Sequence, residues 1–574
     1  MTESSWREAQ LPLQDVPPGP AHSGRAPDAG GKRVRHFRQI LLWPLQLMPI
    51  RPDAQLQKHW ELLQLAGPDN PWRELAGEFT GDPARFEERH YNEFVTFLPQ
   101  VQRFLYGEGM EQGNHAWLAE SPIRVFRRND IAGARVSYGD GLPPVDFGVA
   151  HVDLYFFYDI DVVLLAVEVH ASDLTLECVQ DTLYRFGRTY PLHWDGLGRA
   201  SHCLEKVEWL SAAGHTLACS DFERRDKYLA FVREHRSPCI ASHWEFLLRP
   251  LVHHHSGEQG PIRYRQIEYH RLPVAAYLAL DDPRALSQAE FVRLSLATAP
   301  GSDESLPQAD RGRRYAEARH FYDRYWSPDS GGPSTRFMCS GHALVVVGSH
   351  NDPQFADFET GVLGEFRHQY FLLFLIAHFH KAALLMLSER LVAVLGTLDI
   401  DNGESTKQFK RATRRIFEIF LRFTHRYWFH EVSDQVGPRE LFRMCSDHLG
   451  ADRLYAEVRE EIEDMINYLD SDSLRRQSNT VVRLTVVTTF GLIASVTTGF
   501  LGMNLIAAAD SPPSEKLAYF FAVLIPAAFL TFYAVLRSRR LSDFMEALSD
   551  DRLPPRAKLS ALARVWRRRG ESSV

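Results

Sequence analysis

Two apolar segments near the end of the chain constrain its fold more than any other feature. They run from Val481 to Leu501 and from Leu517 to Leu536, and each is about as long as a helix needs to cross a bilayer. Arg483, at the edge of the first, is their only charged residue. Pro526 stands inside the second, where a membrane helix tolerates proline because neighbouring groups satisfy the freed carbonyl. We expect two transmembrane helices. A buried helical hairpin in a soluble core is the alternative.

The charges around these segments predict their orientation. Arginines stand before or at the start of the first segment and after the end of the second. The loop that joins the two segments contains Lys516 as its one basic residue. Positive flanks stay on the cytoplasmic side, so both termini are expected there. The start of the chain is polar and rich in proline and glycine, with no signal peptide, so insertion relies on the C-terminal pair. A multi-pass protein of a cell inner membrane fits best. The flanking arginines are Arg475, Arg476, Arg483, Arg537, Arg539 and Arg540.

Composition and motifs exclude several other classes of protein. The 574 residues carry a formal net charge of -8, which gives no broad basic field for nucleic acid. The six cysteines show no C-x-x-C spacing, so neither a disulfide framework nor a zinc finger is expected. No nucleotide-binding or hydrolase signature is present, and we expect neither an enzyme nor a resident cofactor.

A third apolar stretch, from Tyr370 to Leu387, competes for membrane status. His378, His380 and Lys381 interrupt its centre, where charge or imidazole is costly in lipid. A third span would also place the N-terminal part of the chain on the side opposite the basic flanks. We therefore interpret this stretch as a long, largely buried helix of a soluble bundle.

The region before position 350 mixes strand and helix signals, which predicts an α/β or α+β domain. Two apolar runs, Val152 to Tyr158 and Val162 to Val169, flank Asp159 to Asp161 and read as a hairpin. Two further strands and two helices are predicted by shorter patterns. These are Ile123 to Phe126 and Ala343 to Val347 for the strands, and Leu286 to Ala297 and Arg313 to Trp326 for the helices.

After this region only helical patterns remain. They cover Phe358 to Leu395, Lys407 to Phe429 and Pro438 to Asp470. No glycine or proline lies between Leu454 and Val482, so the last helix is expected to continue into the first membrane segment as one rod. Such a rod would transmit a cytoplasmic event to the membrane.

The predicted architecture is an α+β cytoplasmic domain, a long-helix bundle or stalk, and two C-terminal transmembrane helices. The predicted boundaries are a disordered segment 1–33, the cytoplasmic α/β domain 34–350, the helical and stalk region 351–479, the transmembrane pore domain 480–536 and a basic cytoplasmic tail 537–574.

The first membrane segment has a face suited to lining a pore. Its small, hydroxylic or aliphatic side chains recur every three or four residues, which places them in one stripe of a helix. Two spans cannot enclose a hydrophilic path, so a pore requires several copies around an axis. The alternative is that the stripe packs on the second span. The stripe consists of Leu484, Thr488, Leu492, Ser495 and Gly499.

A Gly-Met-Asn tripeptide at Gly502, Met503 and Asn504 closes the first segment on the side opposite the arginines. This tripeptide, followed by a short loop and a second span and preceded by a long charged helix, resembles the CorA-type magnesium channel family. The resemblance covers roughly Leu474 to Arg540. It implies a homo-oligomer, expected to be a pentamer, whose first span lines the pore and whose tripeptide forms the selectivity ring. The residues before about position 350 are more numerous than those of the compact cytoplasmic domain that is typical of the family.

The resemblance implies that Asn504, with the carbonyl of Gly502, holds the transported metal ion. Magnesium dehydrates reluctantly, so neutral amide oxygens suit its hydrated form through outer-sphere hydrogen bonds. Asp510 and Glu515 in the nearby loop would raise the local cation concentration, or are simply solvated.

At the inner end, Ser478 is expected to line the pore entrance. Asp464, Asp470 and Asp472 are candidate regulatory cation sites, because relatives in the family bind magnesium between subunits and thereby favour a closed state. The alternative for each is the solvated face of a charged helix.

The predicted function is a magnesium channel or transporter of the inner membrane, gated by cytoplasmic cation binding. A zinc, nickel or cobalt transporter, proton-coupled or not, is one alternative, and a membrane-anchored sensor or scaffold with a non-conducting pore is another. Lipid, divalent cations and further copies of the chain are the expected partners. Weaker candidates for metal sites are His253 to His255, the pair His378 and His380, and the pair Asp159 and Asp161, for which loop, core and turn roles are favoured.

Overall fold

The structure is a computed structural model of the whole chain. It describes residues 32–50, 58–68, 70–75, 88–107, 122–139, 141–268, 270–301, 319–327, 334–399, 403–502 and 512–536, and within the last two ranges the side chains of 403, 470–487, 489, 501, 530, 532 and 534–536 fall outside the description. The predicted disordered segment, apart from residues 32 and 33, and the predicted basic tail lie outside the described residues.

The described strands join into one mixed sheet of 14 strands in the order β12-β13-β14-β11-β1-β6-β5-β4-β7-β8, with β10 beside β1, β9 beside β10, β3 beside β5 and β2 beside β3. Most neighbours are antiparallel, and β11 with β14 and β9 with β10 are parallel. The strands are β1 Arg33–Leu47, β2 Trp72–Glu74, β3 Ile123–Arg128, β4 Gly133–Ser137, β5 Val145–Phe157, β6 Ile160–Thr175, β7 Lys206–Leu210, β8 Thr216–Cys219, β9 Val252–His253, β10 Arg263–Gln266, β11 Val274–Leu280, β12 Phe321–Tyr322, β13 Arg336–Cys339 and β14 Ala343–Ser349.

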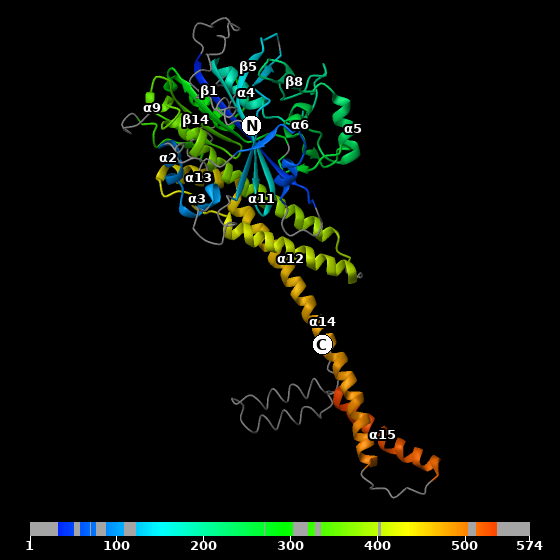
Figure 1. Cartoon of the computed structure of the whole chain (residues 1–574). Coiled ribbons are helices and arrows are strands. Elements are labelled where there is room, and N and C mark those ends of the chain that lie inside the picture. Colours follow the sequence, from blue (N-terminus) through cyan, green and yellow to red (C-terminus); the bar gives the residue numbers. More distant parts are fainter. Residues whose placement is uncertain are drawn as a thin grey trace, which may run out of the picture. The chain divides into compact units, whose positions relative to one another are not determined.

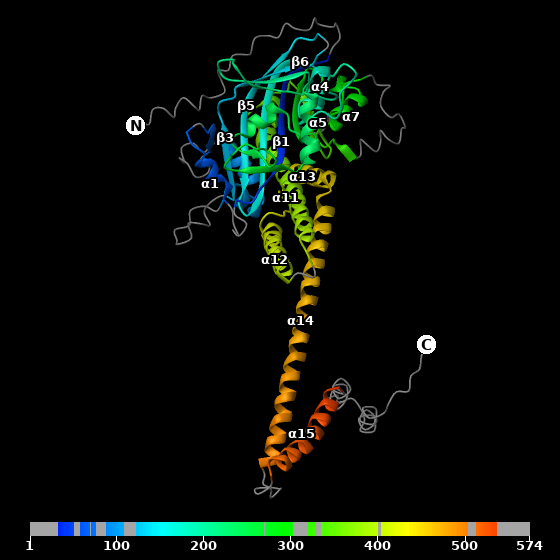
Figure 2. The ribbon, with the colours of Figure 1, turned by 90° about the vertical axis from the view of Figure 1, so that its right-hand side faces the viewer.

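The central strand β1 carries a proline without losing a needed hydrogen bond. One edge of β1 pairs with β6 along nearly its whole length, as Figure 2 shows. The other edge pairs with β11 up to Leu41 and with β10 from Leu45 onward. Pro44 falls between these two partners, where its missing N–H costs nothing.

The predicted hairpin is confirmed. Strands β5 and β6 pair antiparallel around a turn at Tyr158 and Asp159, and Asp159 adopts a φ of 69° there. Aspartate tolerates this left-handed conformation better than most residues. The predicted strands at β3 and β14 and the predicted helix at α7 (Gln288–Leu296) are also confirmed.

Short helices lie between the strands, and the long helices follow the last strand. In the order of the chain they are α1 His59–Gln64, α2 Glu88–Thr96, α3 Pro99–Tyr106, α4 Leu176–Arg185, α5 Arg225–His235, α6 Ser242–Leu248, the 3₁₀ turn η4 Pro283–Ala285, α7, α9 Pro353–Ala356, α10 Val362–Glu365, the π-helix η7 Phe366–Tyr370, α11 Phe371–Gly396, α12 Gly403–Arg426, α13 Val436–Leu449, α14 Ala451–Gly502 and α15 Pro513–Leu536.

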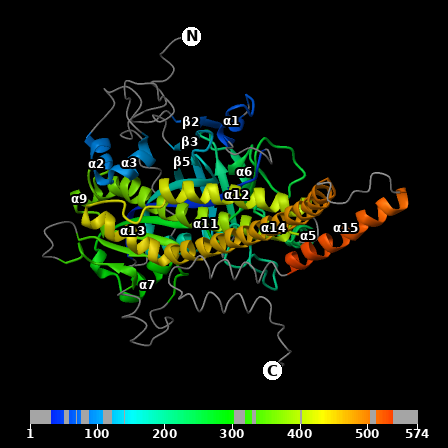
Figure 3. The same cartoon turned by 90° about the horizontal axis from the view of Figure 1, so that it is seen from below.

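Both faces of the sheet are covered. On one face, Phe37 and Trp43 of β1 belong to a core cluster that also contains residues of α4 and α6. Helix α11 packs against β1 and β6, and Ile40 and Leu42 are buried outside that cluster. Figures 1 and 3 show α11 beside α12 and α13, with which it also makes contact.

Two predicted helices differ from the structure. Within the predicted helix Arg313 to Trp326, the described part contains strand β12 instead, because Phe321 pairs with Met338 of β13. The predicted helix Pro438 to Asp470 is divided into α13 and α14 at Gly450, which has a φ of 67°. Glycine ends helices in this left-handed conformation without steric cost.

The chain divides into two compact units, residues 1–463 and 464–574. The predicted boundary at 350/351 falls inside the first unit, because the helical region after it packs on the sheet. Helix α14 is continuous from Ala451 to Gly502, so the expected uninterrupted helix between the stalk and the first apolar segment is confirmed.

Candidate functional site

The predicted pore stripe lies on α14. Its described members Thr488, Leu492, Ser495 and Gly499 are all exposed, and Leu492 retains 57% of its accessible surface. The backbone of Ser478 and Leu484 lies on the same helix, but their side chains are outside the described part. The stripe is therefore open on the single chain where the structure describes it.

A different face of the same helix is buried. Ile493 and Thr497, one turn apart, retain 8% and 1% of their surface. The Thr497 hydroxyl donates to the carbonyl of Ile493 at 2.8 Å, which satisfies it within the helix. At about 100° per residue, this buried pair is centred roughly 150° around the helix from the stripe. The stripe and the packing face are thus nearly opposite.

Large apolar side chains are exposed along this part of α14 and along α15. On α15, Phe529 retains 74% of its surface and Ile525 retains 62%. A patch of this kind on a single chain marks a surface that contacts lipid or other protein. Further exposed members are Phe490, Val496 and Phe500 on α14, and Leu517, Tyr519 and Phe521 on α15.

Within the described residues, one helical segment, Val362–Gly396, is long and apolar enough to cross a membrane. In its most apolar stretch of 18 residues, 78% is buried. A shorter apolar stretch covers Phe490–Phe500. Since 78% of the 18-residue stretch is buried, the prediction that this third apolar segment is a core helix is confirmed. The membrane placement of the two C-terminal segments stays a prediction.

The tripeptide begins where α14 ends. Gly502 is the last residue of the helix and is exposed. Met503 and Asn504, together with Asp510, lie outside the described residues. Glu515 lies in the first turn of α15, where an acidic side chain interacts favourably with the helix dipole.

The candidate regulatory carboxylates lie on α14. Asp464 is exposed to solvent. The side chains of Asp470 and Asp472 are outside the described part. Asp464 belongs to the same continuous helix as the stripe, so a displacement of Asp464 would be transmitted along that helix to the stripe.

The histidine candidates form no metal site. In the described part of the chain, no group of three or more histidine, cysteine, aspartate or glutamate residues is arranged to hold a metal ion. His253 and His255 lie with their ring centres 5.7 Å apart, near the ring of Phe231. His380 is buried in α11, where its Nε2 bonds the carbonyl of Tyr427 at 2.5 Å.

The two aspartates of the hairpin form ion pairs with arginines. Asp159 pairs with Arg426 of α12 at 2.7 Å, and Asp161 pairs with Arg390 of α11 at 2.6 Å. Each carboxylate thus attaches the β5–β6 turn to a helix of the same unit. The turn role that the sequence favoured is found for Asp159, whereas Asp161 is the second residue of β6.

Sequence reasoning missed a buried ionic network between the sheet and η7. His151 contacts Asp153 at 3.0 Å and Glu168 at 2.7 Å, and both carboxylates are fully buried. Arg127 donates two hydrogen bonds to Asp153, and Arg367 of η7 donates to Glu168 at 3.2 Å. The visible signal was one acidic residue inside each of the two predicted apolar runs, Asp153 in Val152 to Tyr158 and Glu168 in Val162 to Val169.

The charges of this network stabilise one another. Burial disfavours the charged forms, but the carboxylates of Asp153 and Glu168 still raise the pKa of His151 to about 9. Despite the same burial, His151 and Arg127 lower the pKa of Asp153 to about 2. The network therefore stays ionised at neutral pH and fixes η7 against the sheet.

No protein-family model matches the chain, and no curated protein matches it. Among solved structures, the chain is similar to the CorA magnesium transporter from Methanocaldococcus jannaschii, at 14% sequence identity and a TM-score of 0.16. The match covers 48% of this chain and 95% of that chain.

Proposed function

We propose that the chain is one protomer of an oligomeric, non-enzymatic channel that conducts magnesium across a cell inner membrane. The apolar parts of α14 and α15 would span the bilayer, and both termini would lie in the cytoplasm. Copies of α14 would surround the ion path, in the pentamer that the resemblance to the CorA type implies.

The observation that carries this proposal is the opposition of two faces on α14. Its buried pair, Ile493 and Thr497, accounts for packing, so Ser495 and Gly499 need not serve that purpose. Small and hydroxylic side chains on an open face of an apolar helix suit water and ions in an assembly. Leu492, on the same face, would form a hydrophobic constriction.

The tripeptide supplies the second support. Its first residue, Gly502, is the last residue of α14, so a ring of Asn504 side chains would stand at the outer end of the path. Carboxamide oxygens would accept hydrogen bonds from the water shell of magnesium, which the ion gives up reluctantly. An inside-negative potential would drive the dication inward with about 4.6 kcal/mol per 100 mV.

Gating would use the continuity of α14. Cytoplasmic magnesium bridging acidic residues such as Asp464 between protomers would hold neighbouring helices together. Loss of that ion would let them move apart and widen the constriction at Leu492. Because the helix runs unbroken to Gly502, the same movement would reach the filter.

The test is magnesium influx into liposomes that contain the purified chain, an interior magnesium dye and an imposed inside-negative potential. The parent is expected to conduct, and Asn504→Ala is expected to lose influx or selectivity. Asn467→Ala is the matched control, since Asn467 is an exposed residue of α14 far along the helix from the tripeptide.

No influx by a folded, oligomeric parent would contradict the magnesium proposal. Zinc flux that responds to a pH gradient in the same liposomes would then indicate the transition-metal transporter. Absence of any flux would indicate the non-conducting sensor or scaffold.

A further inference from the structure

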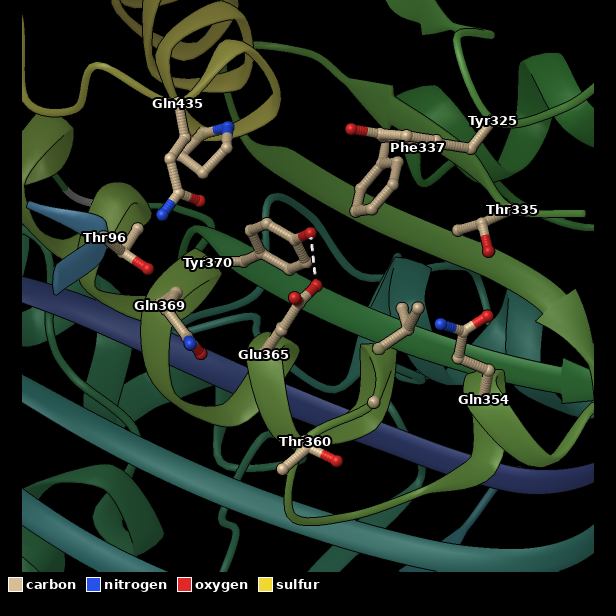
Figure 4. Close-up of a pocket in the computed structure, with 13 residues that line it drawn as sticks. Thr96, Tyr325, Thr335, Phe337, Gln354, Thr360, Glu365, Gln369, Tyr370 and Gln435 are labelled. Carbon is tan, nitrogen blue, oxygen red and sulfur yellow. Dashed lines mark hydrogen bonds between the residues drawn. The ribbon is translucent and has the colours of Figure 1, made fainter. Parts of the chain in front are cut away.

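The first unit contains a polar cavity that the proposed channel does not use. Its volume is about 220 Å³, and α9, α10, η7, β13 and the residues that begin α13 contribute to its wall. Figure 4 shows Gln435, Gln369 and Glu365 around Tyr370, with Gln354 farther to the right, below Thr335 in this view. All these residues lie before position 464, within one compact unit.

The π-helix η7 builds one side of this cavity. In an α-helix, residues five apart point in directions about 140° apart. A π-helix bonds residues five apart, so Glu365 and Tyr370 come onto one face. The Tyr370 hydroxyl consequently donates to Glu365 Oε2 at 2.6 Å.

One fully buried polar group in the wall lacks a partner in the part of the chain that the structure describes. Thr335 retains only 1% of its surface, and its hydroxyl has no hydrogen-bond partner among the described residues. A buried hydroxyl without a partner is costly, which indicates a site completed by a ligand. The side-chain amides of Gln354, Gln369 and Gln435 also line the cavity, with Gln369 largely buried and the other two exposed.

Among the described residues, the wall carries a carboxyl group without a cation to balance it. Glu365 is the one carboxyl group that the described part of the chain contributes to the wall, and no described lysine, arginine or histidine lines it. Burial raises the pKa of Glu365, and the Tyr370 hydrogen bond only partly offsets this. A cationic group at this position would relieve the cost of the partly buried carboxylate.

We propose that this cavity binds a small organic amine, with its ammonium group on Glu365. The carboxamides and the Thr335 hydroxyl bind the polar atoms of the ligand, and the rings of Phe337 and Tyr370 contact its carbon atoms. The volume exceeds the roughly 150 Å³ cavity that holds benzene, so a ligand of about ten non-hydrogen atoms fits.

The experiment measures binding to the full-length chain in detergent by titration calorimetry. The probes are ethanolamine, putrescine and phenylethylamine, each compared with its neutral counterpart, ethylene glycol, butanediol and phenylethanol. At least one amine is expected to bind and to slow amide hydrogen exchange in Val362–Tyr370, while its neutral counterpart does neither.

Glu365→Gln keeps the shape of the side chain and removes its charge, so it is expected to weaken amine binding at least about tenfold. Glu359→Gln is the matched control, because Glu359 is exposed and does not line the cavity, and it is expected to bind like the parent. Gln354→Ala, at the exposed rim, is expected to weaken binding about threefold without affecting folding.

Three results would overturn the proposal. They are no binding by any of the three amines at millimolar concentration, equal binding of amines and neutral counterparts, and unchanged affinity in a folded Glu365→Gln variant. None of them depends on magnesium flux, so they leave the channel proposal untouched.

Discussion

Helices α11 and α15 are both long and apolar, yet they have opposite surroundings. In α11, Leu375, Ile376 and Phe379 retain none of their accessible surface. In α15, Ile525 and Phe529 retain most of theirs. Apolar length alone therefore does not identify a membrane helix. What distinguishes the two is whether the chain itself supplies the neighbours.

The polar residues inside α11 explain why it belongs in protein. Lys381 forms an ion pair with Glu268, and His380 bonds the backbone of Tyr427. These partners come from the first unit, and a lipid environment would not offer them. Helix α15 has no charged residue or histidine from Leu517 to Leu536, so none of its side chains in this range requires an ionic partner or a hydrogen bond of this kind.

The largest expected effect separates the two helices by stability. The Phe379 ring is fully buried and stacks on Phe157 at a centroid distance of 3.9 Å. Phe379→Ala is expected to lower the free energy of unfolding of the first unit by about 3–5 kcal/mol, since it leaves a cavity. Phe529→Ala in α15 is expected to change it by less than about 0.5 kcal/mol.

Tryptophan fluorescence during denaturant unfolding in detergent measures this difference in a Trp566→Phe background, because the other ten tryptophans precede position 464. A Phe529→Ala effect as large as that of Phe379→Ala would mean that α15 is also part of the folded core.

A smaller expected effect concerns how the stability of the first unit depends on pH. Burial lowers the pKa of His380 to about 3, whereas an unfolded histidine titrates near pH 6.5. The stability that His380 contributes is therefore fully present above about pH 6.5 and is lost as the pH falls toward 3. Each pH unit within this window costs about 1.4 kcal/mol.

The measurement compares the parent with His380→Gln at about pH 7 and about pH 5.5, where the parent is expected to lose about 1.4 kcal/mol more. Equal losses would show that His380 is not held neutral in the core, and would weaken the distinction between α11 and a membrane helix.

Much of the first unit could be predicted where local pattern and tertiary structure agree. The β5–β6 hairpin was visible because two apolar runs flank a turn-forming aspartate. The break at Gly450 could have been predicted from the same kind of signal, since glycine commonly ends helices. Strand β12 could not, because two residues become a strand only through pairing with β13.

The pore stripe on α14 could be predicted only in part. Residue spacing placed Leu492, Ser495 and Gly499 on one face of α14, but the segment is apolar all round, so composition did not reveal which face packs. The buried pair Ile493 and Thr497 supplies that information. The cavity at Glu365 was not predictable, because it depends on a π-helix and on residues brought together from distant parts of the chain.

The most direct test of the account asks which face of α14 meets water in the assembled channel. Ser495→Cys and Thr497→Cys are made in a chain whose Cys178 and Cys219, the cysteines that are not buried, are serine. A cationic methanethiosulfonate reagent is then applied during magnesium influx into liposomes. We expect the reagent to block Ser495→Cys and to leave Thr497→Cys unaffected. Block of Thr497→Cys alone, or of neither variant while both conduct, would contradict this expectation.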